Sequence, residues 1–167
     1  MASLDRIKSS SIGRAGFTIV ELLIVVVVIG VLAAIVIVAY NGITSSANDA
    51  AVESDLANLA KKIELFKVQN GAYPTNSTEL VAADIKVTQS VYMPDRNNLY
   101  YCRTDDLTSY AVGAESITGS DYFLVNGSVS PSGGVSGAAT CAQLDPAASS
   151  WVSTGQSSTN VWQAWTE

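Results

Sequence analysis

The sequence predicts an α+β protein, in which one long N-terminal α-helix packs along its second half on a small antiparallel β-sheet head. Three observations lead to this fold class. Residues 22–40 carry no charged side chain, apolar residues recur at helical spacing as far as residue 66, and short segments that alternate between apolar and polar residues follow from residue 99. The helix should therefore have an apolar half, suited to a membrane, and an amphipathic half.

The apolar run is long enough to cross a membrane. Its 19 residues, 22–40, would reach about 28 Å as a helix, the thickness of the hydrocarbon core of a bilayer. Glu21 directly precedes this run, and a carboxylate at the centre of a membrane costs about 2.5–3.5 kcal/mol. We therefore expect a positively charged group to meet Glu21.

The residues before the run indicate its orientation. Residues 1–16 contain Arg6, Lys8 and Arg14 but only one acidic residue, Asp5, and a short basic segment of this kind stays in the cytoplasm. An ordinary secretory signal, cut after the small residues at 33 and 34, is the alternative. It is disfavoured because the apolar run continues to residue 40.

Residues 14–23, with the sequence RAGFTIVELL, resemble the processing site and helix start of type IV prepilins and related pseudopilins. The resemblance extends to the Gly-Ala-Tyr-Pro sequence at residues 71–74. It implies a pilin-like fold, cleavage between Gly16 and Phe17 by a prepilin peptidase, and N-methylation of Phe17. Residues 1–16 would then be a cytoplasmic leader peptide, while the apolar helix stays in the product.

Cleavage would create a cationic amine on Phe17, one helical turn before Glu21 and on the same face. The two groups could pair within one subunit. In the resembling family the glutamate is taken to meet the amine of a neighbouring subunit, which would make Phe17 and Glu21 assembly residues. The alternative is a carboxylate that only favours the positive end of the helix dipole, which is worth about 0.3–1 kcal/mol.

Gly30 lies within the apolar run and has two interpretations. Many type IV pilins have a helix-breaking proline in this segment, and their helix unwinds locally after a glycine in the filament. This chain has Gly30 but no proline between residues 17 and 73, so flexibility at this glycine stays open. Close packing of neighbouring helices explains a glycine in an apolar helix equally well.

The helical pattern continues beyond the apolar run. Apolar residues recur at spacings of three and four: Val52, Leu56, Leu59, Ile63 and Phe66. We predict one helix over residues 17–70, about 80 Å long, which ends at the Asn-Gly pair 70–71. Its first part, 17–45, would lie in the membrane or in a filament core, and its second part, 46–70, would pack on the head.

Residues 71–167 should form the head. Asn76 is expected to cap a short helix, because Glu79 follows at the third helical position. Strands are predicted at residues 99–103, 109–114 and 121–125, and the Asn-Gly pair 126–127 predicts a tight hairpin into residues 128–130. Apolar residues of these strands, including Tyr110 and Tyr122, should cover the amphipathic half of the helix.

Composition argues against several classes of function. Without the leader, the chain keeps six basic and 14 acidic side chains, a net charge of −8, which disfavours direct binding of nucleic acid by one subunit. It has no histidine, the commonest general base and metal ligand. We therefore expect no enzyme activity, no catalytic residues, no metal site and no cofactor.

Cys102 and Cys141, the two cysteines of the chain, are predicted to form a disulfide outside the cytoplasm. Closing a loop of this size contributes on the order of 4 kcal/mol to stability. Two separately buried thiols are the alternative. The Ser- and Gly-rich residues after Ser130 are expected to be loop, tied down by Cys141.

The three tryptophans lie within the last 17 residues, at positions 151, 162 and 165. Disordered tails seldom carry so much aromatic surface. We expect these side chains to pack against the head or a neighbouring subunit. An exposed adhesive edge that contacts a cell or a carbohydrate is the alternative.

The function that follows from the resemblance is that of a structural subunit of a type IV pilus, which serves adhesion, twitching motility or DNA uptake. The subunit would sit in the cytoplasmic membrane, with its leader in the cytoplasm, before it joins an extracellular filament. Implied partners are identical or related pilins, the prepilin peptidase, an inner-membrane assembly platform and, for an adhesive fibre, a cell-surface receptor. One alternative is a pseudopilin of a type II secretion-like or competence machine; another is a membrane-anchored binding domain that never polymerises.

Overall fold

The computed structural model describes residues 16–94, 96–144, 151–155 and 162–166. Contacts divide the chain into two compact units, Met1–Asn41 and Gly42–Glu167. Helix α1 (Ile19–Asn70) belongs to both units, which confirms the predicted long N-terminal helix. It begins two residues later than predicted, because Thr18 caps it. The predicted leader falls on residues 1–15, outside the described residues, apart from Gly16.

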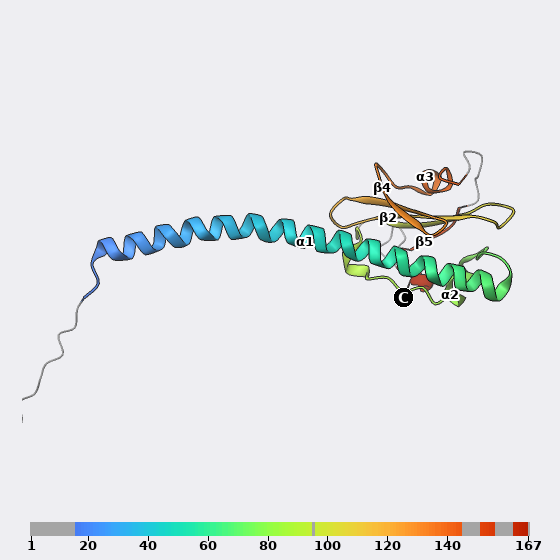
Figure 1. Ribbon diagram of the computed structural model, residues 1–167, viewed down its shortest axis with the longest axis horizontal. Helices are drawn as coiled ribbons and strands as arrows, with labels where there is room; N and C mark the ends of the chain where they lie inside the picture. The colour runs from blue at the N-terminus through green and yellow to red at the C-terminus, as the bar shows by residue number, and fades with distance from the viewer. Residues whose placement is uncertain (1–15, 95, 145–150, 156–161, 167) are drawn as a thin grey trace, which may run out of the picture. The chain divides into compact units, whose positions relative to one another are not determined.

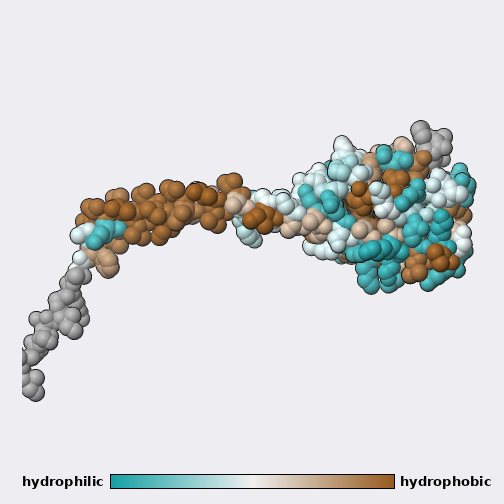
Figure 2. Space-filling view, viewed as in Figure 1, coloured by the Kyte–Doolittle hydropathy of each residue, from teal (hydrophilic) through white to brown (hydrophobic). Residues whose placement is uncertain are grey.

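The part of α1 in the first unit has no charged side chain after Glu21, and its visible face is apolar, as the brown surface in Figure 2 shows. Its large side chains, from Ile19 to Val38, are all at least half exposed. By length and composition, α1 is the one helix of the described chain that could cross a membrane. Because nothing in the unit covers these side chains, water, lipid or another chain must meet them.

The second unit contains a five-stranded antiparallel sheet with the strand order β4-β3-β2-β1-β5. The strands are β1 (Leu99–Arg103), β2 (Tyr110–Glu115), β3 (Asp121–Val125), β4 (Ser128–Ser132) and β5 (Trp151–Thr154). The bounds of β1 and β3 are as predicted, β2 lies one residue later, and β4 is two residues longer. The turn between β3 and β4 is formed by Asn126 and Gly127, both at positive φ, as a tight hairpin requires.

One face of the sheet packs on the second half of α1 and forms the core. The buried face of α1 consists of the predicted residues together with Ala60: Val52, Leu56, Leu59, Ala60, Ile63 and Phe66. Tyr110 and Val112 of β2 and Leu124 of β3 are fully buried in the same cluster. The predicted packing of the sheet on the helix is therefore confirmed.

Two short helical segments connect α1 to the sheet: α2 (Ser77–Ala82) and the 3-10 helix η1 (Gln89–Val91). The Asn76 side chain accepts a hydrogen bond from the Glu79 N–H at 3.0 Å, as the cap prediction requires. The Glu79 carboxylate in turn accepts from the Thr75 N–H at 2.7 Å. These bonds fix the start of α2.

The other face of the sheet is covered by α3 (Gly137–Cys141), so the sheet lies between α1 and α3 (Figure 1). A Cβ atom on Gly113 of β2 would collide with the side chains of Thr140 and Val135, so this glycine permits the close approach. The expectation that all residues after Ser130 are loop is wrong for β4, α3 and β5. These short elements depend on packing and strand pairing that local sequence patterns do not show.

Two of the three tryptophans have described side chains. Trp165, in the 3-10 helix η2 (Ala164–Thr166), is 1% exposed within the core, and Trp162 packs edge-on against Tyr92 at 5.9 Å between ring centroids. Packing against the head is therefore the correct interpretation for these two. The side chain of Trp151 lies outside the described residues.

Candidate functional site

The predicted processing site lies at the start of α1. Gly16 and Phe17 precede the first helical residue, Ile19, and both are exposed, Phe17 by 83%. A Cβ atom on Gly16 would have no neighbour within 4 Å, so the chain itself does not require glycine there. The bond between Gly16 and Phe17 is thus in an open, non-helical segment, the form in which a peptidase can bind a substrate backbone.

Glu21 makes a reciprocal set of hydrogen bonds with Thr18. The Glu21 carboxylate accepts from the Thr18 N–H at 2.8 Å and from the Thr18 hydroxyl at 2.7 Å, while that hydroxyl accepts from the Glu21 N–H at 3.2 Å. This arrangement is a capping box, which satisfies backbone donors that a helix start leaves without partners. The sequence signal, Thr-x-x-Glu, was present, but our sequence analysis considered only the charge of Glu21.

The capping box affects how Glu21 can meet a partner. Its carboxylate is exposed and already oriented at the start of the helix. Phe17 and Glu21 line one shallow apolar pocket with Leu22, Ile24 and Val25. A cationic group that approaches this pocket would meet a carboxylate surrounded by apolar side chains, where a charge pair is stronger than in water.

The helix continues without a break through Gly30. Gly30 is exposed, and an added Cβ atom would have no neighbour within 4 Å. The surface at this point is therefore open to another helix. Both suggested roles of Gly30, flexibility and close helix packing, remain predictions.

The second half of α1 is held to the head by Asp49. Its carboxylate accepts hydrogen bonds from the hydroxyls of Ser116 at 2.7 Å, Thr118 at 2.5 Å and Ser120 at 2.9 Å, all from the β2–β3 turn. Burial acts to raise the pKa of Asp49, but these hydrogen bonds outweigh it and lower the pKa below its ordinary value. The carboxylate therefore stays ionised as it holds the turn.

Asp55, on the same half of α1, holds a different segment. Its carboxylate accepts from the Thr88 N–H at 2.6 Å and from the Tyr92 hydroxyl at 3.2 Å. The sequence alone indicated no partners for Asp49 and Asp55. Their partners lie 33 or more residues away, so no local pattern could have revealed them.

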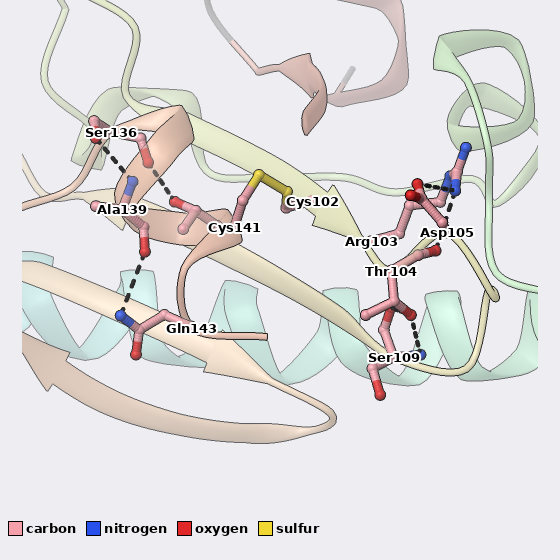
Figure 3. Close-up of a disulfide and its surroundings, with 10 residues drawn as sticks. Cys102, Arg103, Thr104, Asp105, Ser109, Ser136, Ala139, Cys141 and Gln143 are labelled. Carbon is pink, nitrogen blue, oxygen red and sulfur yellow. Dashed lines mark hydrogen bonds and ion pairs between the residues drawn. A yellow bond between two sulfur atoms is a disulfide. The ribbon is translucent and has the colours of Figure 1, made fainter. Parts of the chain in front are cut away.

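Cys102 and Cys141 form the predicted disulfide, with 5.3 Å between their Cα atoms. Figure 3 shows that the bond joins β1 to the end of α3. At the start of α3, the Ser136 hydroxyl accepts from the Ala139 N–H at 3.1 Å. The disulfide and this cap hold α3 on the sheet. Within the described residues, no cluster of three potential metal-ligating side chains occurs.

Comparison with known proteins gives one family match and two kinds of relative. Residues 13–37 match the family described as "Prokaryotic N-terminal methylation motif". The type IV wide pilus major component PilA4 of Thermus thermophilus is 36% identical over 73 residues, which cover 44% of this chain and 56% of that protein. No solved structure matches.

Relatives of a second kind are type II secretion system core proteins G. The protein from Pectobacterium carotovorum is 31% identical over 85 residues, 51% of this chain and 53% of its own length. The protein from Klebsiella pneumoniae is 37% identical over 69 residues, 41% of this chain and 49% of its own length. The chain thus spans about half the length of the curated relatives it matches.

The motif, the apolar helix that follows it and the α+β head define one class: this chain belongs to the type IV pilin and pseudopilin family. Members of this family are structural proteins and not enzymes, in agreement with the sequence analysis. The family also implies anchoring in the inner membrane before assembly. This class includes both pilus subunits and the pseudopilins of secretion machines.

Proposed function

We propose that this chain is the structural subunit of a type IV pilus, an extracellular filament for adhesion, twitching motility or DNA uptake. The observation that carries the proposal is the apolar half of α1, exposed on all sides and preceded by the Gly16–Phe17 processing sequence. Moving a large apolar side chain out of water is favourable by about 1.5–3 kcal/mol of free energy. Lipid covers this half of the helix before assembly. In the filament, the same halves of neighbouring subunits cover it.

Processing prepares the subunit for assembly. Prepilin peptidase cleaves between Gly16 and Phe17 on the cytoplasmic side and methylates the new amine. The Glu21 carboxylate of a subunit already in the filament then receives the Phe17 amine of the incoming subunit. Glu21 exchanges its Thr18 hydrogen bonds for a charge pair, and two charges that would be costly in an apolar filament core neutralise each other.

A second candidate function is that of a pseudopilin, whose short filament works within a secretion machine. It is favoured by the similarity to type II secretion system core proteins G. Processing, membrane storage and the role of Glu21 are the same for both candidates. A third candidate, a membrane-anchored domain that never polymerises, predicts that loss of Glu21 changes nothing.

The test replaces Glu21 and measures cleaved protein in membranes beside fibres sheared from the cell surface. Glu21→Ala should leave insertion and cleavage intact, because it removes a charge that is costly in a membrane, but fibre yield should fall strongly. Glu21→Gln is the matched control, since glutamine keeps the capping box without the charge.

If the charge is what assembly needs, Glu21→Gln should fail as completely as Glu21→Ala, whereas Glu21→Asp should keep some fibre. Normal fibre yield in Glu21→Gln would show that only the cap matters. A wild-type chain that never yields fibres would favour the anchored domain.

A further inference from the structure

A groove of about 410 Å³ lies on the exposed side of α1 in the second unit. Lys61, Lys62 and Leu65 of α1 form one wall, and Asp84 and Lys86, which follow α2, form the other. Lys62 pairs with Asp84 at 2.8 Å, and Lys86 lies 3.9 Å from the same carboxylate. We call this surface the lysine groove. The Lys62–Asp84 pair joins the two walls.

The lysine groove is opposite in charge to the chain that carries it. Three lysines and one aspartate give it a net charge of +2, whereas residues 17–167 have a net charge of −8. It holds three of the six basic side chains that remain after the leader. Leu65 lines the groove and is 51% exposed, so the groove also offers apolar contact. An acidic partner with one apolar side chain would match it.

The turn between β1 and β2 has this composition. Asp105 and Asp106 are adjacent and exposed, and Leu107 follows at a φ of 59°, a left-handed conformation that leucine rarely adopts. The Asp106 side chain accepts from the Thr108 N–H at 3.1 Å, and the Leu107 N–H donates to the Thr104 carbonyl at 3.0 Å, so the turn is shaped by its own bonds. We call residues 105–107 the acidic turn.

Other carboxylates of the described head are already used to join elements. Those that accept hydrogen bonds or ion pairs from another part of the head are Asp49, Asp55, Glu64, Glu79 and Glu115. Glu53 is exposed but stands alone on α1. The Asp105 side chain pairs with Arg103 of the neighbouring strand at 4.0 Å and is 87% exposed (Figure 3). The acidic turn is therefore the described surface at which two exposed carboxylates stand together.

We propose that the lysine groove of one subunit binds the acidic turn of a second copy of this chain. The inference deepens the proposed function, on which it rests, because it names a second contact between subunits besides the one at Glu21. The groove and the turn share no residue, so the contact is heterologous: each copy offers one surface and uses the other. Contacts of this kind build open helical filaments when the rotation does not close a ring.

The contact selects and orients the incoming head. Exposed ion pairs contribute little affinity and are screened over about 8 Å at physiological salt, so burial of the apolar helices remains the driving force for assembly. Opposite charge on the two surfaces favours the orientation that brings them together. The lysine groove therefore helps to set the position of each head relative to the next one in the filament.

Cross-linking in wild-type fibres tests the contact directly. A carbodiimide joins a lysine amine to a nearby carboxylate as an amide with loss of water, and mass spectrometry of the dimer band identifies the joined peptides. We expect links from Lys61 or Lys86 to Asp105 or Asp106 in fibres. The same links should be absent from the detergent-dissolved monomer, which controls for contacts within one chain.

Charge reversal provides a second test. Lys61→Glu with Lys86→Glu makes the groove acidic but leaves the Lys62–Asp84 pair, and Asp105→Lys with Asp106→Lys makes the turn basic. Each double variant alone should give about tenfold less fibre, because like charges now meet. When both variants are expressed in one cell, fibres should return, since acidic grooves then meet basic turns and basic grooves meet acidic turns.

The matched control adds Glu53→Lys to the acidic-groove variant, and it should restore nothing, because Glu53 lies outside both surfaces. Fibres without the expected cross-links, or no recovery on co-expression, would overturn the inference and leave the proposed function intact. A cleaved wild-type chain that forms no fibres would overturn both.

Discussion

At the scale of residues, the segment from Gly16 to Glu21 has two features: it caps the start of α1, and it contains the proposed cleavage site. The Glu21 carboxylate accepts from the Thr18 N–H, and the Thr18 hydroxyl accepts from the Glu21 N–H. The helix can therefore begin next to an apolar run with these backbone donors paired. Gly16 has a different role, because no atom of the described residues lies within 4 Å of a Cβ built at this position. We therefore propose that glycine is needed here by the peptidase that binds this segment.

Gly16→Val should block removal of the leader without disturbing the fold. The added side chain meets nothing in the chain itself, so any effect reflects obstruction in the peptidase. The mass of the protein recovered from membranes distinguishes a chain that starts at methylated Phe17 from one that keeps its leader. Gly42→Val is the control, because Gly42 is equally open and lies on α1 away from the cleavage site. A leader-bearing wild-type chain in assembled fibres would contradict the proposed processing.

At the scale of elements, two polar contacts and one disulfide hold the head together around its apolar core. Asp49 and Asp55 tie the second half of α1 to two loops, and Cys102 ties β1 to α3. Each contact joins segments that lie more than 30 residues apart in the chain. Such contacts limit the conformational freedom of the loops between them.

Asp49→Ala should destabilise the second unit by about 1–2 kcal/mol at pH 7, because three hydroxyls lose their common acceptor and the turn is partly screened by water. The pKa of Asp49 is lower in the folded chain than in the unfolded chain. The stabilisation by Asp49 is therefore complete above its pKa in the unfolded chain, about 3.9. It is lost as the pH falls through its lower pKa in the folded chain.

Thermal unfolding of the full chain in detergent, measured from pH 7 down to pH 3, checks this expectation. The difference in stability between wild type and Asp49→Ala should shrink at acidic pH. Glu53→Ala, one turn further along α1, is the control and should stay close to wild type throughout. A difference that grows on acidification would show that the carboxylate form of Asp49 is not the stabilising one.

Cys141→Ser should lower the stability of the full chain by about 2–5 kcal/mol, the range for native disulfides in small secreted domains. The loss should appear first in α3, because Cys141 is the last residue of that helix. Thermal unfolding with and without reductant measures the effect, and reductant should not change the variant. Two thiols titrated in the folded, unreduced wild-type chain would contradict the disulfide.

At the scale of the whole molecule, composition and membrane anchoring point to an exposed filament. Residues 17–167 carry a net charge of −8, and the head is rich in Ser and Thr and contains a disulfide, features suited to a fibre surface outside the cell. Charged surfaces of one sign also keep finished fibres apart. These features favour the pilus over the pseudopilus, while the similarity to secretion proteins favours the second candidate.

Fibre shearing and gene deletion, both at native expression levels, distinguish a pilus subunit from a pseudopilin. Cells should release long fibres on shearing, with this chain, cleaved at Phe17, as a component, and deletion of the gene should abolish adhesion, twitching or DNA uptake. Secretion of exported proteins should stay unchanged in the deletion strain. Lost secretion with no sheared fibres would identify the chain as a pseudopilin.

Local patterns in the sequence determined the parts of this fold that depend on neighbouring residues. The spacing of apolar residues predicted the buried face of α1, and alternation predicted β1 and β3 with their bounds. The Asn76 cap, the Asn126 turn and the processing motif are each formed by residues that lie close together in the sequence. The disulfide was predictable because only two cysteines exist to form it.

Tertiary structure alone decided the remaining parts. Helix α3 has no apolar periodicity and depends on the disulfide and on the space above Gly113, while β5 exists because β1 offers it an edge. The same holds for the partners of Asp49 and for the two walls of the lysine groove, which come from α1 and from the residues after α2. Each depends on residues far apart in the chain, whose contact becomes favourable only after the core has brought them together, and no local pattern contains that information.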